Sequence, residues 1–212
     1  MIFLVDAGRR WHFAADLAEM HRQRKAVFVD RAGWKVPVAA DQEIDRYDLR
    51  QDTLYLLAKD ECTGTVLASA RLLTTTGPHL MCDLFASDDR EKMPRGCTVW
   101  EVSRFCTAPG IQARDRRHEL LWEVICGVLE TGLLYGIDEV IFAANRALLP
   151  LALNCGWEVR TLTRDRSARD HDATAVAAVV TTAGLRRVRQ LHGVAVPIIQ
   201  IHANSNTSGA LP

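Results

Sequence analysis

Residues 98–106 read TVWEVSRFC, and this short stretch carries much of the information about the fold. Valine, tryptophan and phenylalanine favour a strand that packs into a core. Glu101 and Arg104 lie in the middle of this apolar run, although burying a charge is costly unless the charge is paired or used. Strict alternation along a strand would point these two side chains to opposite faces of a sheet. We therefore predict a bulge or splay in the strand, which would bring both charges to one cleft.

The segments around this strand predict one mixed sheet covered by helices. Apolar strand patterns occur at residues 2–5, 53–59, 65–73, 138–144, 157–162, 173–182 and 196–202. Helical spacing of apolar residues occurs at 13–29, 115–136, 146–156 and 184–192. Antiparallel strands followed by alternating helices and strands indicate a single-domain α/β fold, a mixed sheet flanked by helices in an α/β/α sandwich. We expect the domain to cover residues 1–202 and a frayed tail to cover 203–212.

The segment 30–52 lies between the first helix and the second strand and shows little periodicity. It is long for a loop in a compact domain, and such loops are usually functional or mobile. Trp34 lies on this loop, and Glu43, Asp45 and Asp48 place three carboxylates within six residues. One interpretation is a solvated acidic loop. The other is a mobile segment that orders over a substrate.

The composition is that of an ordinary folded protein, with 212 residues, 48% apolar residues and 25% charged residues. Lys and Arg together number 26, as do Asp and Glu, so net charge gives no reason to expect nucleic acid or a membrane surface as partner. No apolar run approaches the ~20 residues that span a bilayer. The six cysteines show no C-x-x-C pair and the seven histidines show no metal-binding spacing. We expect a cytoplasmic protein with reduced thiols and no bound metal.

Charged residues recur at positions where the pattern predicts burial or an approach to the sheet. They are Arg24, Asp45, Asp48, Arg71, Glu101 and Arg104. Arginine forks bind carboxylates and carboxylates hold cations, while aromatic faces such as those of Phe28 and Trp34 attract cations or stack on flat rings. A pocket of mixed sign would suit a zwitterion. The alternatives are a self-satisfied ion network and, for Arg24, a stem that packs on the core while its head reaches water.

Taken together, these segments resemble the acyl-homoserine lactone synthases of the LuxI type. The resemblance is carried by RKAVFVDRAGW (24–34), EIDRYD (43–48), ARLL (70–73) and WEVSRF (100–105), in order and at fitting spacing, and it covers about residues 2–165. It implies a fold akin to the GNAT acyltransferases. It also implies an enzyme of quorum-sensing signal synthesis that transfers an acyl group from an acyl thioester to the amine of S-adenosylmethionine, closes a lactone and releases methylthioadenosine. Both reactants are substrates, and no cofactor is expected.

The resemblance also implies roles for individual residues. Glu101 would be the general base, with Arg104 beside it. Arg24 would orient the carboxylate of S-adenosylmethionine, and Phe28 and Trp34 would close over its adenosyl side. The remaining substrate-binding residues are Asp45, Asp48 and Arg71. The two aspartates would fix the loop by pairing with Arg71 and Arg104. Burial would raise the pKa of the Glu101 carboxyl, and Arg104 would lower it again.

The acyl chain would need an apolar pocket beside the strand 98–106. The candidate lining residues are Ser103, Phe105, Trp122, Ile125, Phe142 and Ala144, and plain core packing is the alternative for each of them. In relatives that select 3-oxo chains, a threonine on the strand after the long helix bonds the oxo group, and Phe142 is the aligned residue here. An aromatic side chain there favours an unsubstituted, short, branched or aromatic acyl group.

Two rival functions are weighed against this one. Ordinary GNAT acetyltransferases cradle a pyrophosphate with a glycine-rich stretch at a helix N-terminus, whereas residues 111–121 read IQARDRRHELL. This disfavours a generic N-acyltransferase that uses acyl-CoA. The acyl donor stays open, since an acyl-carrier protein or an acyl-CoA could both meet Arg114, Arg116 and Arg117. A binding module built on the basic helix 184–193 is the non-enzymatic alternative, although such runs are more often solvated faces.

Overall fold

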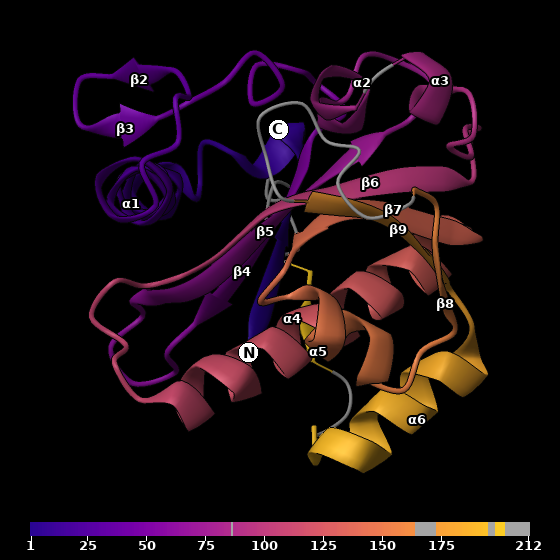
Figure 1. The fold of residues 1–212 in the computed structure, drawn as a ribbon. Coiled ribbons are helices and arrows are strands. Elements are labelled where there is room, and N and C mark those ends of the chain that lie inside the picture. The colour runs from indigo at the N-terminus through magenta and orange to yellow at the C-terminus, as the bar shows by residue number, and fades with distance from the viewer. Residues whose placement is uncertain (86, 164–172, 195–197, 202–212) are drawn as a thin grey trace, which may run out of the picture.

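The computed structural model describes residues 1–85, 87–163, 173–194 and 198–201, and in them eight strands form one mixed sheet (Figure 1). The strands are β1 (Ile2–Val5), β4 (Leu54–Lys59), β5 (Val66–Thr74), β6 (Val99–Thr107), β7 (Glu139–Asn145), β8 (Val159–Thr161), β9 (Ala173–Val179) and β10 (Ile199–Gln200). Their order is β10-β1-β4-β5-β6-β7-β9-β8. The pairs β1–β10 and β6–β7 are parallel, and the other neighbours are antiparallel. The predicted mixed sheet is confirmed.

Helices cover both faces of the sheet, as the predicted α/β/α sandwich requires (Figure 1). One face carries α4 (Arg114–Tyr135), α5 (Leu149–Asn154) and α6 (Thr182–His192), and the other carries α1 (Ala14–Arg24), α2 (Leu80–Leu84) and α3 (Ser87–Arg90). The main apolar core lies under α4, where Val124 and Val128 belong to one buried cluster with Leu56. On the opposite face, Leu17 and Met20 of α1 pack with neighbouring sheet residues. None of the helices in the described ranges is long and apolar enough to cross a membrane.

The helix predicted at 13–29 changes its geometry part-way along. After α1 the chain continues as a π-helix, η2 (Lys25–Arg31). Wider turns of this kind are rare and occur frequently at functional sites. Arg24 ends α1 and Phe28 lies in η2, and both side chains are buried. The transition therefore delivers one cation and one aromatic ring to the buried side of this segment.

Strand β6 contains the predicted bulge. Ser69 of β5 lies opposite Cys106, whereas Arg71 lies opposite Ser103, so two steps along β5 match three along β6. Arg104 has a φ of 54°, a left-handed conformation that costs a residue with a Cβ about 1–2 kcal/mol. The extra residue reverses the alternation beyond Ser103. The structure thus brings the side chains of Ser103 and Arg104 to the same face.

Strands β6 and β7 separate at the same place. Their parallel ladder joins residues 99–101 to residues 139–141, yet β6 continues to Thr107 and β7 to Asn145. Both strands therefore continue beyond the last pair of the ladder, Glu101 and Ile141, without bonding to each other. The sheet therefore opens directly beside Glu101.

The segment 30–52 is more ordered than the predicted loop. It contains a small hairpin of β2 (Val38–Ala39) and β3 (Gln42–Glu43), with a tight turn in which Ala40 has a φ of 55°. Residues 35–41 are largely exposed, whereas Glu43, Asp45 and Asp48 are buried. Mobility stays a prediction, and the buried end of the segment argues against motion there. The predicted tail 203–212 lies outside the described residues. Of the strand predicted at 196–202, residues 198–201 are described, and β10 covers Ile199–Gln200.

Candidate active site

Three arginines and three carboxylates meet in the space between α1 and the sheet. This ion network consists of Arg24 from α1, Arg71 from β5, Arg104 from β6, and Glu43, Asp45 and Asp48 from the segment 30–52. Every member is at most 8% exposed. Buried charges are tolerated when geometry is good and further hydrogen bonds satisfy them. The network has as many cations as anions, and its hydrogen bonds of 2.6–3.0 Å between them meet the condition of good geometry.

Arg24 is completely buried and uses its whole guanidinium on the protein. Its Nε donates to Oε2 of Glu43 at 2.6 Å, and its two terminal nitrogens donate to the two oxygens of Asp48 at 2.9 Å each. The prediction that Arg24 orients the carboxylate of a substrate does not fit this geometry, because its donors already face protein carboxylates. Arg24 instead fixes the segment 30–52 against α1.

Arg71 and Arg104 complete the ion network from the sheet side. Arg71 donates to Asp45 at 2.6 and 3.0 Å and to Asp48 at 2.9 Å. Arg104 donates to Glu43 and to Asp45, both at 3.0 Å. The paired arginines hold the pKa of the Asp48 carboxyl far below its usual range, against the opposing effect of burial. The expected pairing of the loop carboxylates with Arg71 and Arg104 is therefore confirmed, as is the alternative of a self-satisfied network.

An aromatic pair covers the outer side of the ion network. The rings of Phe28 and Trp34 are stacked, with centroids 4.8 Å apart and planes inclined by 10°. The guanidinium carbon of Arg104 lies 5.7 Å from the centroid of the Phe28 ring. Phe28 is buried and Trp34 is half-buried, so the tryptophan is the member of the pair that reaches the surface. A flat ring or a cation could be received here.

Glu101 is completely buried, and no ion pair joins it to the other charges in the described residues. Its Oε2 accepts a hydrogen bond from the backbone N–H of Met81 at 2.7 Å. Its Oε1 has no hydrogen-bond partner within the described part of the chain. Burial raises the pKa of Glu101 to about 7, although the Met81 N–H and the charge of Arg71 oppose this rise. The carboxyl is thus poised to exchange a proton near neutral pH.

Arg104 does not pair with Glu101, contrary to the expectation that these two side chains act as a pair. The guanidinium is directed at Glu43 and Asp45 instead. It lowers the pKa of Glu101 only as the last of several influences. The bulge brings both residues to one face of β6, yet it leaves the glutamate as an isolated acid beside the opening of the sheet.

A short turn connects Glu101 to the ion network. Met81 belongs to α2, and the hydroxyl of Tyr47 donates to the carbonyl of His79 at 3.2 Å and bonds to Asp83 on the same turn. The backbone N–H of Tyr47 donates to Asp45 at 2.9 Å. Tyr47 therefore ties the loop to the turn that holds Glu101.

Sequence reasoning missed three parts of this site. Glu43 was visible as one of three clustered carboxylates but was not distinguished from a solvated residue. Tyr47 lies within the same motif and carries no charge to mark it. The contribution of Met81 comes from its backbone N–H, so its side-chain type gives no signal.

The residues predicted to line an acyl pocket divide into two groups. Ile125, Phe142 and Ala144 are buried in the main core, and Phe105 and Trp122 pack against it. Phe142 stacks on Trp157 with ring centroids 5.6 Å apart. Ser103 lies on the other face of the sheet, where it accepts a hydrogen bond from Nε of Arg71 at 3.2 Å. Ser103 is therefore separated from the other five candidates by the sheet.

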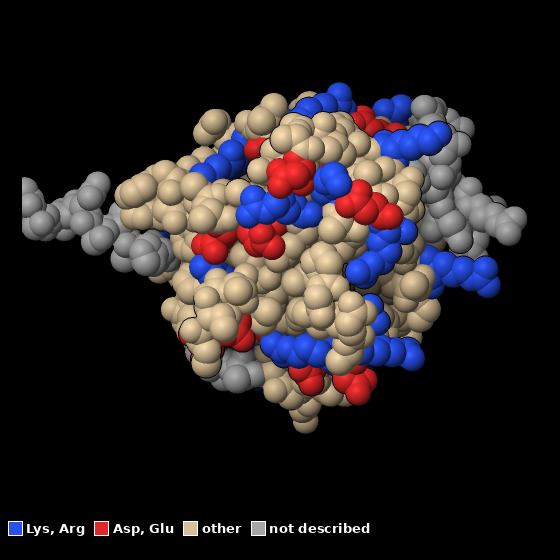
Figure 2. All heavy atoms as spheres, turned by 90° about the vertical axis from the view of Figure 1, so that its left-hand side faces the viewer, with Lys and Arg blue, Asp and Glu red and all other residues tan. Residues whose placement is uncertain are grey.

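The surface charges are mixed rather than segregated. Figure 2 shows basic and acidic side chains next to one another on the face that carries α1 and the β2–β3 hairpin. At the start of α4, Arg116 forms ion pairs with Glu119 and Glu123. Arg114 is exposed and Arg117 half-buried, so these two remain the accessible cations at this helix start.

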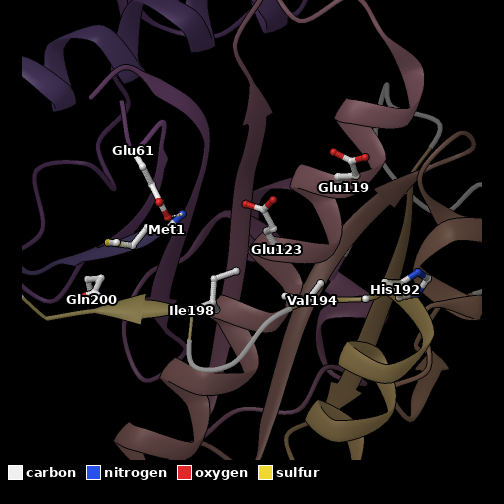
Figure 3. A pocket seen from close by; sticks show the side chains of 9 residues that line it. Met1, Glu61, Glu119, Glu123, His192, Val194, Ile198 and Gln200 are labelled. Atoms are coloured by element: carbon white, nitrogen blue, oxygen red, sulfur yellow. Dashed lines mark ion pairs between the residues drawn. The ribbon is translucent and has the colours of Figure 1, made fainter. Parts of the chain in front are cut away.

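A separate hollow lies beside α4 near the end of α6 (Figure 3). Its described lining residues include Glu61, Glu119, Glu123 and His192. None of the predicted site residues is among them. The hollow is therefore distinct from the site around Glu101.

Comparison with known proteins agrees with the fold and identifies the family. A family model described as "Autoinducer synthase" matches residues 10–188. An acyl-homoserine-lactone synthase of Rhizobium etli is 34% identical over 149 residues, which cover 70% of each chain. The solved structure of "a COA-dependent acyl-homoserine lactone synthase, BjaI, with SAM and isopentyl-CoA" is 26% identical with a TM-score of 0.82, over 95% of this chain and 93% of that chain.

A more distant likeness concerns the fold alone. A putative N-acetyltransferase from Lactobacillus plantarum is 16% identical with a TM-score of 0.56, over 85% of this chain and 98% of that chain. The expected GNAT-like architecture is thereby confirmed. Since the family model spans most of the chain, the chain belongs to the autoinducer synthase family, the acyltransferases that make acyl-homoserine lactones.

Proposed function

We propose that Glu101 is the general base of acyl transfer to S-adenosylmethionine. The observation that carries this proposal is the complete burial of Glu101 outside the ion network. This burial raises the pKa of Glu101 to about 7. A free α-amine titrates at about 7.7–8.0, so a base with a pKa close to 7 is matched to it. General-base help of this kind is typically worth ~10²–10⁴ in rate.

The acyl transfer requires two proton transfers and one exchange of bonds. The ammonium of S-adenosylmethionine gives its proton to Oε1 of Glu101, directly or through a water. This oxygen is the one without a partner in the described residues. The neutral amine then attacks the thioester carbonyl and the C–N bond forms. The C–S bond breaks, and the second proton of the attacking nitrogen passes to the departing thiolate, which leaves as the thiol. Backbone N–H groups beside the opening of β6 and β7 are suitable donors to the oxyanion.

Lactone formation needs little further chemistry from the protein. The carboxylate of the acylated methionine attacks its own Cγ, and the sulfonium departs as methylthioadenosine. The protein mainly has to hold the chain folded back on itself. Phe28 and Trp34 are suited to cover the adenosyl side, since they form a stacked pair at the edge of the ion network. Arg24, Arg71, Asp45 and Asp48 act by positioning these elements, because their charged groups bind one another.

We infer that the acyl donor is an acyl-CoA, and that the reaction takes place in the cytoplasm, where such donors are made. The likeness to the structure of a CoA-dependent synthase with isopentyl-CoA supports this donor. Phe142 supports a short or branched chain, because its ring and that of Trp157 fill the core where a longer chain would pass. An acyl-carrier protein is the competing donor and forms the second arm of the test.

The test is incubation of the protein with S-adenosylmethionine and matched acyl groups, presented as acyl-CoA and as acyl-carrier protein. Mass spectrometry would follow acyl-homoserine lactone and methylthioadenosine. We expect both products in equal amounts, with acyl-CoA as the faster donor. A generic N-acyltransferase would release the thiol without methylthioadenosine. Faster turnover with the carrier protein would overturn the donor assignment while leaving the reaction in place.

A further inference from the structure

Arg10 is a half-buried cation whose guanidinium is directed at the backbone of a single turn. The residue follows the short helical turn after β1. One terminal nitrogen donates to the carbonyl of Asp48 at 3.3 Å. The other donates to the carbonyls of Arg50 and Thr53 at 2.7 and 3.2 Å. The donors of this cation therefore hold three backbone carbonyls of the turn 48–53.

The rigid shape of the guanidinium makes this an effective clamp. Its N–H groups form a fixed, planar fork, so the three carbonyls are fixed relative to one another. The guanidinium carbon also lies 5.6 Å from the centroid of the Tyr55 ring, and the hydroxyl of Tyr55 donates to Asp48 at 2.8 Å. Nε of Arg10 is buried and has no hydrogen-bond partner in the described part of the chain. An unpartnered buried donor is costly, and the bonds to the carbonyls have to offset that cost.

Arg50 connects the clamped turn to the segment that holds Glu101. Its guanidinium donates to the carbonyl of Pro78 and, at 2.8 Å, to the hydroxyl of Thr74. A Cβ at Gly77 would lie 3.2 Å from a terminal nitrogen of this guanidinium, so the group packs directly on the glycine. Pro78 lies three residues before the backbone N–H that binds Glu101. Arg50 therefore fixes the chain where it enters α2.

Tyr47 forms a second connection from the same turn. Its hydroxyl bonds to two residues of the α2 segment, and its carbonyl accepts a hydrogen bond from the hydroxyl of Thr53 at 2.6 Å. Thr53 is also one of the residues whose carbonyls bind Arg10. Arg10 thus supports both connections between the turn 48–53 and α2.

We propose that Arg10 is a positioning residue for acyl transfer. By clamping the turn 48–53, it keeps the side chains of Tyr47 and Arg50 in place, and these keep the backbone N–H of α2 against Glu101. The effect on turnover rests on the proposed role of Glu101. The mechanical connection between Arg10 and α2 does not depend on that role, so the two can be tested separately.

The pH dependence of turnover reports on this connection. Burial raises the pKa of Glu101, and the groups that face the carboxyl oppose this rise: the Met81 N–H from α2, Arg71 from β5, and Ser103 and Arg104 from β6. Weakening the N–H bond raises the pKa further, because a hydrogen bond to the charged form favours that form. The acidic limb of the pH–rate profile then moves to higher pH. A loss of overall stability alone would leave the limb in place.

The test compares Arg10→Gln and Arg10→Lys with Arg22→Gln as the matched control. Glutamine removes both the charge and the fork, whereas lysine keeps the charge on a single donor nitrogen and also serves if the glutamine variant does not fold. Arg22 forms an exposed pair with Glu19. We expect both Arg10 variants to slow lactone synthesis by roughly tenfold or more, since small displacements far from the chemistry have large effects, and to move the acidic limb to higher pH. The control should match wild type, and a limb that stays in place in both Arg10 variants would overturn the proposal.

Amide hydrogen exchange, followed by mass spectrometry of peptides, measures the connection without reference to activity. We expect faster exchange at α2 in both Arg10 variants, with exchange in α6 unchanged. Unchanged exchange at α2 would overturn the proposal. Faster exchange with an unmoved acidic limb would overturn the link to Glu101, whereas a wild-type protein that makes no lactone would count against the proposed function alone.

Discussion

At the scale of single residues, Glu101 combines a functional advantage with a cost in stability. Its burial raises its pKa to about 7, which suits a base for an amine. The same burial makes its ionised form unfavourable in the fold. Active sites often carry such costs, which the rest of the structure offsets.

Replacing Glu101 by Gln should therefore separate catalysis from folding. The amide retains the shape and can still accept a hydrogen bond from Met81, but it cannot take a proton. We expect lactone synthesis to fall by roughly 10²–10⁴, with the far-UV circular dichroism spectrum unchanged. Single-turnover assays with S-adenosylmethionine and acyl-CoA would measure the effect. Turnover within a factor of about two of wild type would remove Glu101 as the base.

Sequence reasoning succeeded for residues whose charge conflicts with their surroundings. Glu101 and Arg104 stand out because they interrupt an apolar strand, and both are buried on one face. The expected role of Arg24 as a ligand for a substrate carboxylate does not fit its pairs with Glu43 and Asp48, because the sequence shows that a cation is buried but not which anion it meets. Ser103 lies apart from the other acyl-pocket candidates because the bulge begins directly after it.

At the scale of elements, the bulged strand β6 and the segment 30–52 depend on each other. Arg104 adopts a left-handed conformation, and its bonds to Glu43 and Asp45 hold it there. The bulge was predictable, since two charges three residues apart cannot share a face of a regular strand. The short helix α2 was not, because it has five residues and acts through its backbone.

Arg104→Ala should destabilise the fold strongly. The substitution leaves Glu43 and Asp45 partly uncompensated in a buried site, and removing one partner of a buried pair costs about 3–5 kcal/mol. Alanine keeps a Cβ, so the unfavourable backbone conformation is not relieved. Chemical denaturation would measure the change. Arg22→Ala is the matched control, because Arg22 forms an exposed pair with Glu19, for which about 0–1 kcal/mol is expected. Equal effects of the two substitutions would contradict the importance of the ion network.

Tyr47→Phe should weaken the connection between the loop and α2. It removes the hydroxyl that bonds to His79 and Asp83, so the Met81 N–H is held less firmly against Glu101. That N–H lowers the pKa of Glu101, and its loss raises the pKa further. We expect the acidic limb of the pH–rate profile to move to higher pH, with little change in the fold. Tyr135→Phe, at an exposed site, should leave the profile in place, and an identical profile for both variants would contradict the connection.

At the scale of the whole molecule, the two faces of the sheet have different tasks. The face under α4 and α6 holds the main apolar core. The face under α1 and α2 holds the buried charges and Glu101. Periodicity predicted the strands, the long helices and their sandwich arrangement, since these follow from apolar spacing. It did not predict that the loop carboxylates are as buried as the core, because that depends on contacts between residues distant in sequence.

The folding stability should depend on pH through two kinds of buried acid, the ion-paired Asp48 and the unpaired Glu101. The pKa of Asp48 is lowered in the fold. The stability that this carboxylate contributes is therefore present when the pH lies above its pKa in the unfolded chain, and it is lost as the pH falls through its pKa in the fold. The pKa of Glu101 is raised in the fold. The stability that its protonated form contributes is therefore present when the pH lies below its pKa in the unfolded chain, and it is lost as the pH rises through about 7. Stability should therefore be highest at mildly acidic pH.

The central claim is that Glu101 is an isolated buried acid that ionises near neutral pH. Denaturant unfolding of wild type and Glu101→Gln across this range tests it most directly, because the ion network contributes equally to both proteins. A carboxyl whose pKa moves from 4.5 to about 7 loses about 3 kcal/mol of folding free energy once the pH exceeds both values. We predict that wild type loses this amount relative to the variant between pH 4.5 and about 8. A difference between the two proteins that stays constant over this range would contradict the account.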